Sequence, residues 1–310
     1  MVKTLKALIT SMRPRQWLKN TSLFAAILFG GEVLNATALT KTLEAAIVFS
    51  FLSSAAYLFN DVNDRGRDRR HPLKKERPIA KGTLPVSIAV FTSCLLALGS
   101  LAWAGIRFSH SFFALAATFL LLQLSYSLYF RSVIILDALV VAMAFVLRVY
   151  AGAFVMPTPI SSWLILSVIG LALLLAFGKR RSEWTLLSPL KRHPLTRETL
   201  RHYPDTLLDS IISMAAAFTT ISYAIFSFQT SPITPSSQLL ELIPPTLATP
   251  KWMMLTIPLV IYGVSRYLYI IYEKKEGESP EKALLSDWPL LATTILWATS
   301  IFIIIYGLGG

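Results

Sequence analysis

The chain has 310 residues, of which 54% are hydrophobic and only 15% are charged. Because soluble domains carry about 25% charged residues, this composition excludes a water-soluble fold, and it also excludes disordered and disulfide-rich proteins. The 29 Lys and Arg residues outnumber 17 Asp and Glu residues. In a membrane protein this excess indicates topology and contact with anionic lipid or phosphate, rather than binding of nucleic acid.

The first residues predict a short helix on the membrane surface. Leu5, Leu8, Ile9 and Met12 recur at helical spacing, and the lysines lie off that face. Residues 1–12 are too polar for the apolar region of a signal peptide. We therefore expect residues 1–19 to form an interfacial N-terminal segment.

Nine apolar runs follow, each close to the length that crosses a bilayer. They predict spans at 20–35, 43–59, 86–106, 109–130, 132–155, 160–178, 208–229, 251–272 and 288–308. The first run is the weakest, because its uninterrupted apolar core is short. The expected fold is thus all-α and polytopic, with about nine transmembrane helices in one domain, residues 1–310.

The distribution of cations predicts the orientation. With the N-terminus in the cytoplasm, only Lys41, Arg107 and Lys251 lie on the outer side, and Arg148 and Arg266 lie within spans. The other 24 Lys and Arg residues are then cytoplasmic, many of them in loops at 60–84 and 179–207. This asymmetry follows the positive-inside rule and requires an odd number of spans.

The most informative stretch follows the second predicted span. On a helix, Asn60, Asp61, Asp64 and Asp68 fall within about 100° of one another. Clustered carboxylates repel one another, and Mg²⁺ takes oxygen ligands that it commonly shares with substrate phosphates. The alternative is a solvated loop in which neighbouring arginines neutralise the acids: Arg65, Arg67, Arg69 and Arg70.

Cations and aromatic residues near this stretch are further candidates. Prolines 72 and 78 hold Lys74 and Arg77 in a turn, where they can face an anionic ligand. Positive-inside topology alone would also explain their number. Arg148 and Asp137, both in the fifth span, lie either near a cavity or in an ion pair between helices. For Asp137 a further alternative is simple proximity to the cytoplasmic end of the span. Tyr126 either lines a cavity or belongs to the interfacial aromatic belt.

Several of these motifs resemble a known family. The NDxxDxxxD pattern at 60–68, with DRRHP at 68–72 and RPIAxG at 77–82, resembles the UbiA superfamily of intramembrane prenyltransferases. The RPRQWLKN run at 13–20 and GKRxxE at 178–183 resemble one branch, the decaprenyl-phosphate phosphoribosyltransferases. The resemblance covers nearly the whole chain, although the Asp motif alone specifies only the superfamily.

The resemblance implies nine helices around a central, lipid-open cavity that cytoplasmic loops cap. It implies an enzyme of the bacterial inner membrane that uses Mg²⁺ to transfer a 5-phosphoribosyl group from phosphoribosyl diphosphate to a polyprenyl phosphate, for cell-envelope synthesis. A homo-oligomer is compatible with it. Asp61, Asp64 and Asp68, with Asn60, would hold the metal. The candidate substrate-binding residues are Asn60 again, and Arg15, Lys19, Lys74, Arg77, Tyr126, Arg148, Lys179 and Arg180.

Three departures from the family pattern keep a second function open. The region of the second Asp motif reads GKRRSE at 178–183, and the DxxxD at 205–209 is not one that we recognise from this branch. Arg131 stands where the branch would carry Lys, which keeps the charge and changes the geometry. The alternative is transfer of a polyprenyl chain from its diphosphate to an aromatic or other small acceptor. A transporter is a third, weaker interpretation.

Overall fold

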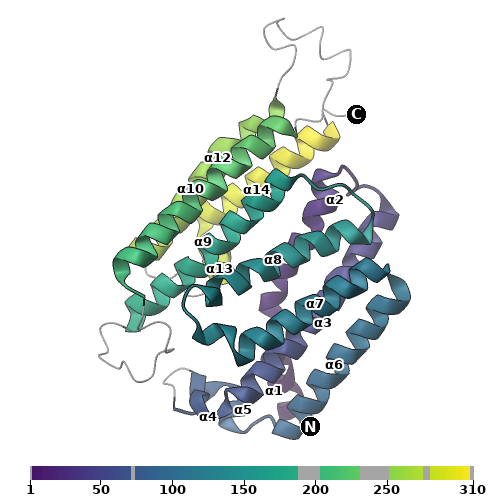
Figure 1. Cartoon of the computed structure of the whole chain (residues 1–310), viewed down its shortest axis with the longest axis vertical. Coiled ribbons are helices and arrows are strands. Elements are labelled where there is room, and N and C mark those ends of the chain that lie inside the picture. Colours follow the sequence, from purple (N-terminus) through teal and green to yellow (C-terminus); the bar gives the residue numbers. More distant parts are fainter. Residues whose placement is uncertain (1, 71–73, 188–202, 231–250, 275–279, 308–310) are drawn as a thin grey trace, which may run out of the picture. The chain divides into compact units, whose positions relative to one another are not determined.

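The computed structural model describes residues 2–70, 74–187, 203–230, 251–274 and 280–307. Every regular element in these ranges is a helix, which confirms the all-α prediction (Figure 1). The predicted N-terminal surface helix is α1 (Val2–Met12). Its Ala7 and Ser11 are buried against the protein, whereas Leu5 and Ile9 are exposed.

Eight helices of the described chain are long and apolar enough to cross a bilayer. Four come from the first half: α3 (Ala36–Asn63), α6 (Val86–Arg107), α7 (His110–Leu128) and α8 (Leu136–Val155). The other four are α9 (Ser162–Leu187), α10 (Asp205–Gln229), η8 with α12 and η9 (Trp252–Lys274), and α14 with η10 (Trp288–Gly307). Their positions match eight of the nine predicted spans.

The first predicted span, 20–35, does not form a long helix. Its residues belong to a 3₁₀ helix, η1 (Pro14–Phe24), and to the five-residue α2 (Ala25–Phe29). The hydroxyls of Thr21 and Ser22 donate to backbone carbonyls three residues earlier, each at 2.8 Å, and such local bonds compete with a regular α-helix. The count of nine spans therefore stays a prediction.

The two predicted cytoplasmic loops contain helical structure. The 60–84 segment holds the end of α3 and three short helices, α4 (Arg65–Asp68), η2 (Lys74–Glu76) and α5 (Pro78–Lys81). In the predicted 179–207 loop, residues 179–187 are helical, because α9 continues unbroken to Leu187. Residues 188–202 of that loop lie outside the described residues.

The chain divides into two compact units, and the first comprises the described parts of 1–27 and 33–158. In it, α3 packs against α1, η1, α6, α7 and α8. A core of aromatic rings joins α3 to α7, with Phe49 lying 5.9 Å from Phe112 and 4.9 Å from Phe119 between ring centroids. Gly152 lets η1 approach α8, since a Cβ there would lie 1.9 Å from the carbonyl oxygen of Leu23.

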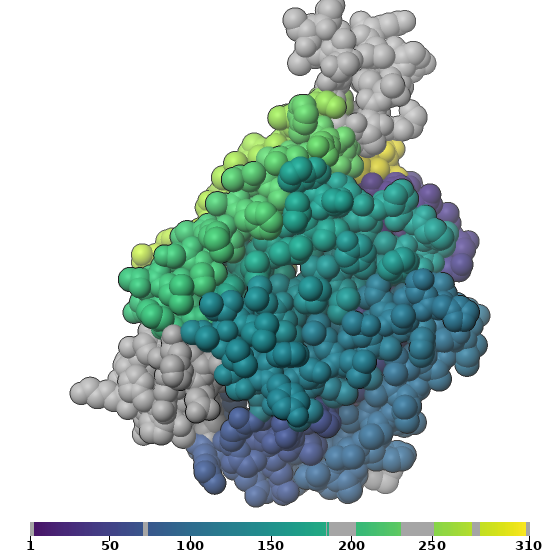
Figure 2. All heavy atoms as spheres, viewed as in Figure 1, coloured from purple at the N-terminus to yellow at the C-terminus, as the bar shows by residue number. Residues whose placement is uncertain are grey.

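The outer surface of this unit is apolar. Figure 2 shows its face on the side of α7 and α8. On α6, Phe91, Leu95, Leu98 and Ile106 are between 59% and 82% exposed. Large apolar side chains at such exposure would be unfavourable in water, and they indicate that this surface faces lipid.

The second unit comprises the described parts of 28–32, 159–191 and 203–310. Here α9 packs along α10, and α12 packs against α10 and α14. The Tyr223 hydroxyl joins these helices, because it lies 2.6 Å from the Thr256 hydroxyl and accepts a hydrogen bond from Trp297 Nε1 at 2.8 Å. The prediction of a single membrane domain over 1–310 is not tested by this division.

Asp287 ties together the end of α12, η9 and the start of α14. It caps α14 by accepting from the Leu290 N–H at 3.0 Å. The Arg266 guanidinium donates to both carboxylate oxygens at 3.0 Å, and Lys274 Nζ donates at 2.7 Å. The hydrogen bonds from Arg266 lower the pKa of Asp287 well below its usual range, and those from Lys274 and the Leu290 N–H act in the same direction.

We expect Asp287→Asn to lower the thermal unfolding midpoint at pH 7. Because the folded pKa of Asp287 is depressed, its stabilisation is present above the unfolded pKa of about 4 and is lost as pH falls below that value. The difference between wild type and variant should therefore shrink towards pH 3 in melts recorded in detergent. The control is Glu76→Gln. The pKa of Glu76 is also lowered, by its hydrogen bond from Lys81, but both side chains are exposed. Equal effects of the two variants would contradict the prediction.

Candidate functional site

The acidic stretch lies at the end of α3, where the helical backbone is nearly continuous. The N–H of Asp64 donates to the Asn60 carbonyl at 2.9 Å, and the N–H of Asp68 donates to the Asp64 carbonyl at 2.8 Å. This geometry carries the acids from α3 into α4. Asp61 and Asp68 are only 2% and 4% exposed, and Asp64 is also buried. Buried carboxylates need compensating charges, and here arginines supply them.

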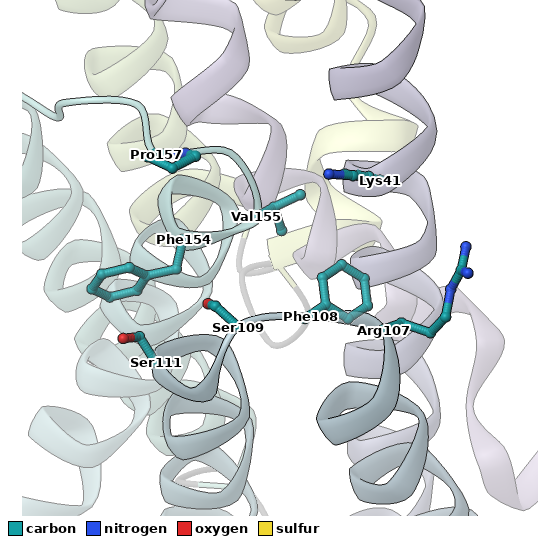
Figure 3. Close-up of a pocket in the computed structure, with 8 residues that line it drawn as sticks. All are labelled: Lys41, Arg107, Phe108, Ser109, Ser111, Phe154, Val155 and Pro157. Carbon is teal, nitrogen blue, oxygen red and sulfur yellow. The ribbon is translucent and has the colours of Figure 1, made fainter.

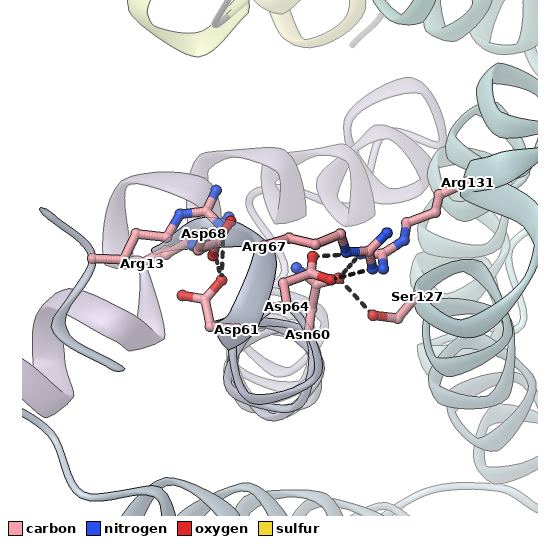
Figure 4. Close-up of polar contacts among 9 residues, drawn as sticks. Arg13, Asn60, Asp61, Asp64, Arg67, Asp68, Ser127 and Arg131 are labelled. Carbon is pink, nitrogen blue, oxygen red and sulfur yellow. Dashed lines mark hydrogen bonds and ion pairs between the residues drawn. The ribbon is translucent and has the colours of Figure 1, made fainter. Parts of the chain in front are cut away.

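Asp61 and Asp68 share one guanidinium. Arg77 Nη1 donates to Asp61 Oδ1 at 3.1 Å and to Asp68 Oδ2 at 2.8 Å. Arg13 Nη2 donates to the same Asp61 oxygen at 2.5 Å (Figure 4). The Arg13 guanidinium also lies over the Tyr57 ring. Arg13 has a left-handed backbone with φ of 55°, which is uncommon for a residue with a side chain. The turn before η1 thus aims this arginine at the acids.

Asn60 and Asp64 form a second group, on the side of α7 and η3 (Phe130–Ser132). Arg131 Nη1 donates to Asn60 Oδ1 at 3.2 Å and also to Asp64 Oδ2. Ser127 Oγ donates to Asn60 Oδ1 at 2.5 Å, and Arg67 Nη2 donates to Asp64 Oδ1 at 2.6 Å. Figure 4 shows the two groups on different sides of the helix end.

Arginines do pair with the acids, but only one of these partners is among the four that the sequence predicts. Of the four neighbouring arginines, Arg67 bonds an acid, whereas Arg69 Nε donates to the Ala80 carbonyl at 3.0 Å. The remaining partners, Arg13, Arg77 and Arg131, come from other elements.

The donor chemistry of this cluster suits Mg²⁺. Three carboxylates and one amide oxygen lie at a helix end, and hard divalent cations bind oxygen ligands of this kind. In the described chain, no three His, Cys, Asp or Glu side chains converge on one point as metal ligands. The cluster therefore fits Mg²⁺ in the chemical type of its ligands. In this structure the guanidinium groups are hydrogen-bonded to the oxygens that a metal would bind.

The other predicted residues of the first unit lie on η1, η2, α7 and α8. Arg15 is exposed on η1, while Lys19 of η1, Lys74 of η2 and Tyr126 of α7 are partly buried. Arg148 is buried on α8. Their roles in substrate binding stay predictions.

Lys179 and Arg180 lie on α9 in the second unit, where Arg180 Nη1 donates to Glu183 Oε2 at 3.0 Å. Arg181, which follows Arg180, pairs with both acids of the DxxxD motif at the start of α10. Arg181 Nε donates to Asp209 Oδ1 at 2.9 Å, and its Nη1 donates to Asp205 Oδ1 at 3.1 Å. A shared arginine makes these two acids an ion-pair network, and among the described residues no third acid joins them as a metal ligand.

Sequence reasoning missed Arg13, Ser127 and Arg131 as members of the acidic cluster. Two of them carried a signal. Arg13 opens the RPRQWLKN motif, in which Arg15 and Lys19 were chosen, and Arg131 replaces an expected cation. Nothing in the sequence marks Ser127, because its contact with Asn60 depends on how α7 packs beside α3.

The fold and this cluster define a class: polytopic helical membrane proteins with buried carboxylates and arginines at the end of a span. The model of the UbiA prenyltransferase family matches residues 21–180. The chain belongs to this family.

Comparison with curated proteins gives relatives of similar length. The chain is 30% identical over 306 residues to the decaprenyl-phosphate phosphoribosyltransferase of Corynebacterium glutamicum, covering 96% of this chain and 86% of that protein. It is 29% identical over 297 residues to the enzyme of the same name from Mycobacterium tuberculosis, covering 94% of this chain and 92% of that protein.

Solved structures show the same fold. A UbiA homologue from Archaeoglobus fulgidus bound to GPP and Mg²⁺ aligns with a TM-score of 0.70 at 20% identity, over 96% of this chain and 99% of that one. The same homologue bound to DMAPP and Mg²⁺ gives a TM-score of 0.69. At this identity the likeness establishes the fold alone.

Proposed function

We propose that this protein transfers the 5-phosphoribosyl group of phosphoribosyl diphosphate to a polyprenyl phosphate, with a divalent metal ion, Mg²⁺, as cofactor. The observation that carries the proposal is the cluster of three buried carboxylates and four arginines at the end of α3. A site with both kinds of charge suits a diphosphate that arrives with a cation, because the acids receive the cation and the arginines receive the phosphates.

The relatives support the choice of donor and acceptor. Both curated relatives are named as decaprenyl-phosphate phosphoribosyltransferases, and the chain covers most of their length. We further propose the membrane orientation that the cation asymmetry predicts, with the N-terminus and the acidic cluster on the cytoplasmic side of a bacterial inner membrane.

The pairing of the acids suggests how the residues act when the donor binds. Arg13 and Arg77 are each about one quarter exposed, whereas Asp61 is buried. These guanidinium groups can therefore turn from the carboxylates towards the donor's phosphates, and a guanidinium binds phosphate in a bidentate manner. Asp61, Asp64 and Asp68, with Asn60, would then be free to hold the metal, whose chemistry there would be to neutralise charge on the diphosphate leaving group.

The reaction needs little beyond position and charge. The bond between ribose C1 and the diphosphate oxygen breaks, and its electron pair leaves with the diphosphate. A phosphate oxygen of the polyprenyl phosphate forms the new bond to C1. This oxygen is already ionised, so no general base is required. The other basic candidates for holding phosphates are Arg15, Lys19, Lys74, Lys179 and Arg180.

One pair of assays tests the proposal. Purified protein with Mg²⁺ is given labelled phosphoribosyl diphosphate and polyprenyl phosphate, and in parallel a labelled prenyl diphosphate and a hydroxybenzoate. We expect a labelled lipid product and released diphosphate in the first mixture alone, and none after chelation of the metal. Product in the second mixture alone would contradict the proposal and favour prenyl transfer to an aromatic acceptor.

A further inference from the structure

A second polar site lies at the opposite end of the first unit from the acidic cluster. A pocket of about 400 Å³ opens there between the start of α3, the turn from α6 to α7, and the end of α8 (Figure 3). Lys41 lines it on α3, the helix that carries Asp61 at its other end. At 1.5 Å per residue these two residues are about 30 Å apart along the helix, the thickness of the hydrocarbon layer.

The pocket has a positive charge. Lys41 points from α3 towards the end of α8 (Figure 3), and no partner for it is found among the described residues. Arg107, at the end of α6, donates to Glu44 at 3.2 Å, so that one of the two cations is compensated and the other is not. Ser109 and Ser111 add hydroxyl groups, and the start of α7 favours negative charge as well.

Most of the cations on the predicted outer side of the membrane gather at this pocket. Under the predicted topology Lys41, Arg107 and Lys251 are the three Lys or Arg residues on the outer side of the membrane. Two of the three line this one pocket, although α3 and α6 are separated in sequence. If these cations served only to solvate the outer surface, they would be expected at scattered positions. Their placement in one pocket favours binding of an anionic ligand.

The surroundings of the pocket are suited to an amphiphile. The Phe108 ring stacks on buried Phe112 at 4.3 Å between centroids and gives the pocket a rigid apolar wall. Ile106, which precedes Arg107 on α6, is 82% exposed, and Phe154, which lines the pocket on α8, is 44% exposed. A ligand with a phosphate head and apolar chains would meet cations and exposed apolar side chains together.

We infer that this pocket binds the phosphate headgroup of an anionic phospholipid from the leaflet opposite the acidic cluster. Lys41 supplies the uncompensated charge, Arg107 and the two serines supply further hydrogen bonds, and the acyl chains lie along the apolar surface of α6 and α8. The site is separate from the proposed catalytic cluster.

The test measures lipid binding directly. Wild type and variants are purified in neutral detergent and titrated with short-chain phosphatidylglycerol or phosphatidylcholine, while the thermal unfolding midpoint is followed. We expect phosphatidylglycerol to raise the wild-type midpoint with saturation and phosphatidylcholine to have little effect. Lys41→Gln should raise the half-saturating concentration about tenfold, as expected for loss of a charge-assisted bond, and Lys41→Arg should restore it.

Lys251→Gln is the matched control. It removes one cation from the same predicted side, but Lys251 lies in the second unit over the Phe228 ring. It should bind phosphatidylglycerol like wild type. If both glutamine variants bound phosphatidylglycerol equally weakly, the effect would come from the general surface potential, and the proposal would be overturned. A wild type that does not respond to phosphatidylglycerol, or that is saturated equally by glycerol phosphate, would also overturn it. Unchanged phosphoribosyl transfer by Lys41→Gln would keep this site distinct from catalysis.

Discussion

Asp61→Asn is expected to lower the turnover number for phosphoribosyl transfer by about 10²- to 10³-fold, while the protein stays folded. Asn keeps the size of the side chain but removes the charge that would hold the metal, and loss of an electrostatic stabiliser of this kind commonly costs 10²- to 10³-fold. Folding should survive because Arg77 keeps its bond to Asp68 and Arg13 is partly solvated. The measurements are release of labelled diphosphate at saturating Mg²⁺ and the thermal unfolding midpoint.

Asp205→Asn is a matched control for this experiment. Asp205 is likewise an Asp at a helix terminus that pairs with an arginine, Arg181, but it belongs to the network on α9 and α10. Its variant should turn over within a few fold of wild type. Full activity of Asp61→Asn would place the metal elsewhere. Equal losses in both variants would show that removing any arginine-paired Asp impairs turnover, and would contradict a specific role for Asp61.

The sequence predicts the long spans well, since their apolar runs contain few charges and are bounded by charged loops. The ends of the predicted 86–106 and 109–130 spans differ by at most two residues from those of α6 and α7. The first span could not be judged in this way. Hydropathy does not reveal that Thr21 and Ser22 bond their own backbone or that Gly152 allows η1 to lie against α8.

At the candidate site, the spacing of the acids along the sequence predicts that they lie at one helix end, but the sequence does not predict which arginines pair with them. Helical periodicity predicts that Asn60 and the three acids share one face of the helix, whereas the structure divides them into two groups, each with its own arginines. Arg13 and Arg131 reach Asp61 and Asp64 from positions 48 and 67 residues away. Such pairs depend on tertiary packing, so that sequence proximity favoured Arg65 and Arg69 instead.

Arg148 is the residue for which the two predicted roles differ most. Its Nε donates to Asn20 Oδ1 at 2.7 Å, its Nη1 donates to the Ala144 carbonyl at 2.8 Å, and it lies over the Phe119 ring. Asn20 in turn donates to the Ser50 hydroxyl at 2.8 Å. Ser50 lies about 16 Å along α3 from Asp61. This polar layer is thus deep in the bundle, and it links α8 to η1, which follows directly on Arg13.

We expect Asn20→Leu to destabilise the protein by about 2–3 kcal/mol, because it removes an acceptor from a buried cation. Arg148→Met should cost less, since Met fills the space without a charge. In the double variant the losses should not add, and the coupling should be about 1 kcal/mol or more. Unfolding midpoints of the four proteins measure this.

If Arg148 only positions η1, kcat should fall in the single variants and recover partly in the double variant. A raised KM for polyprenyl phosphate in both variants that lack Arg148, with additive stabilities, would instead make Arg148 a substrate-binding residue.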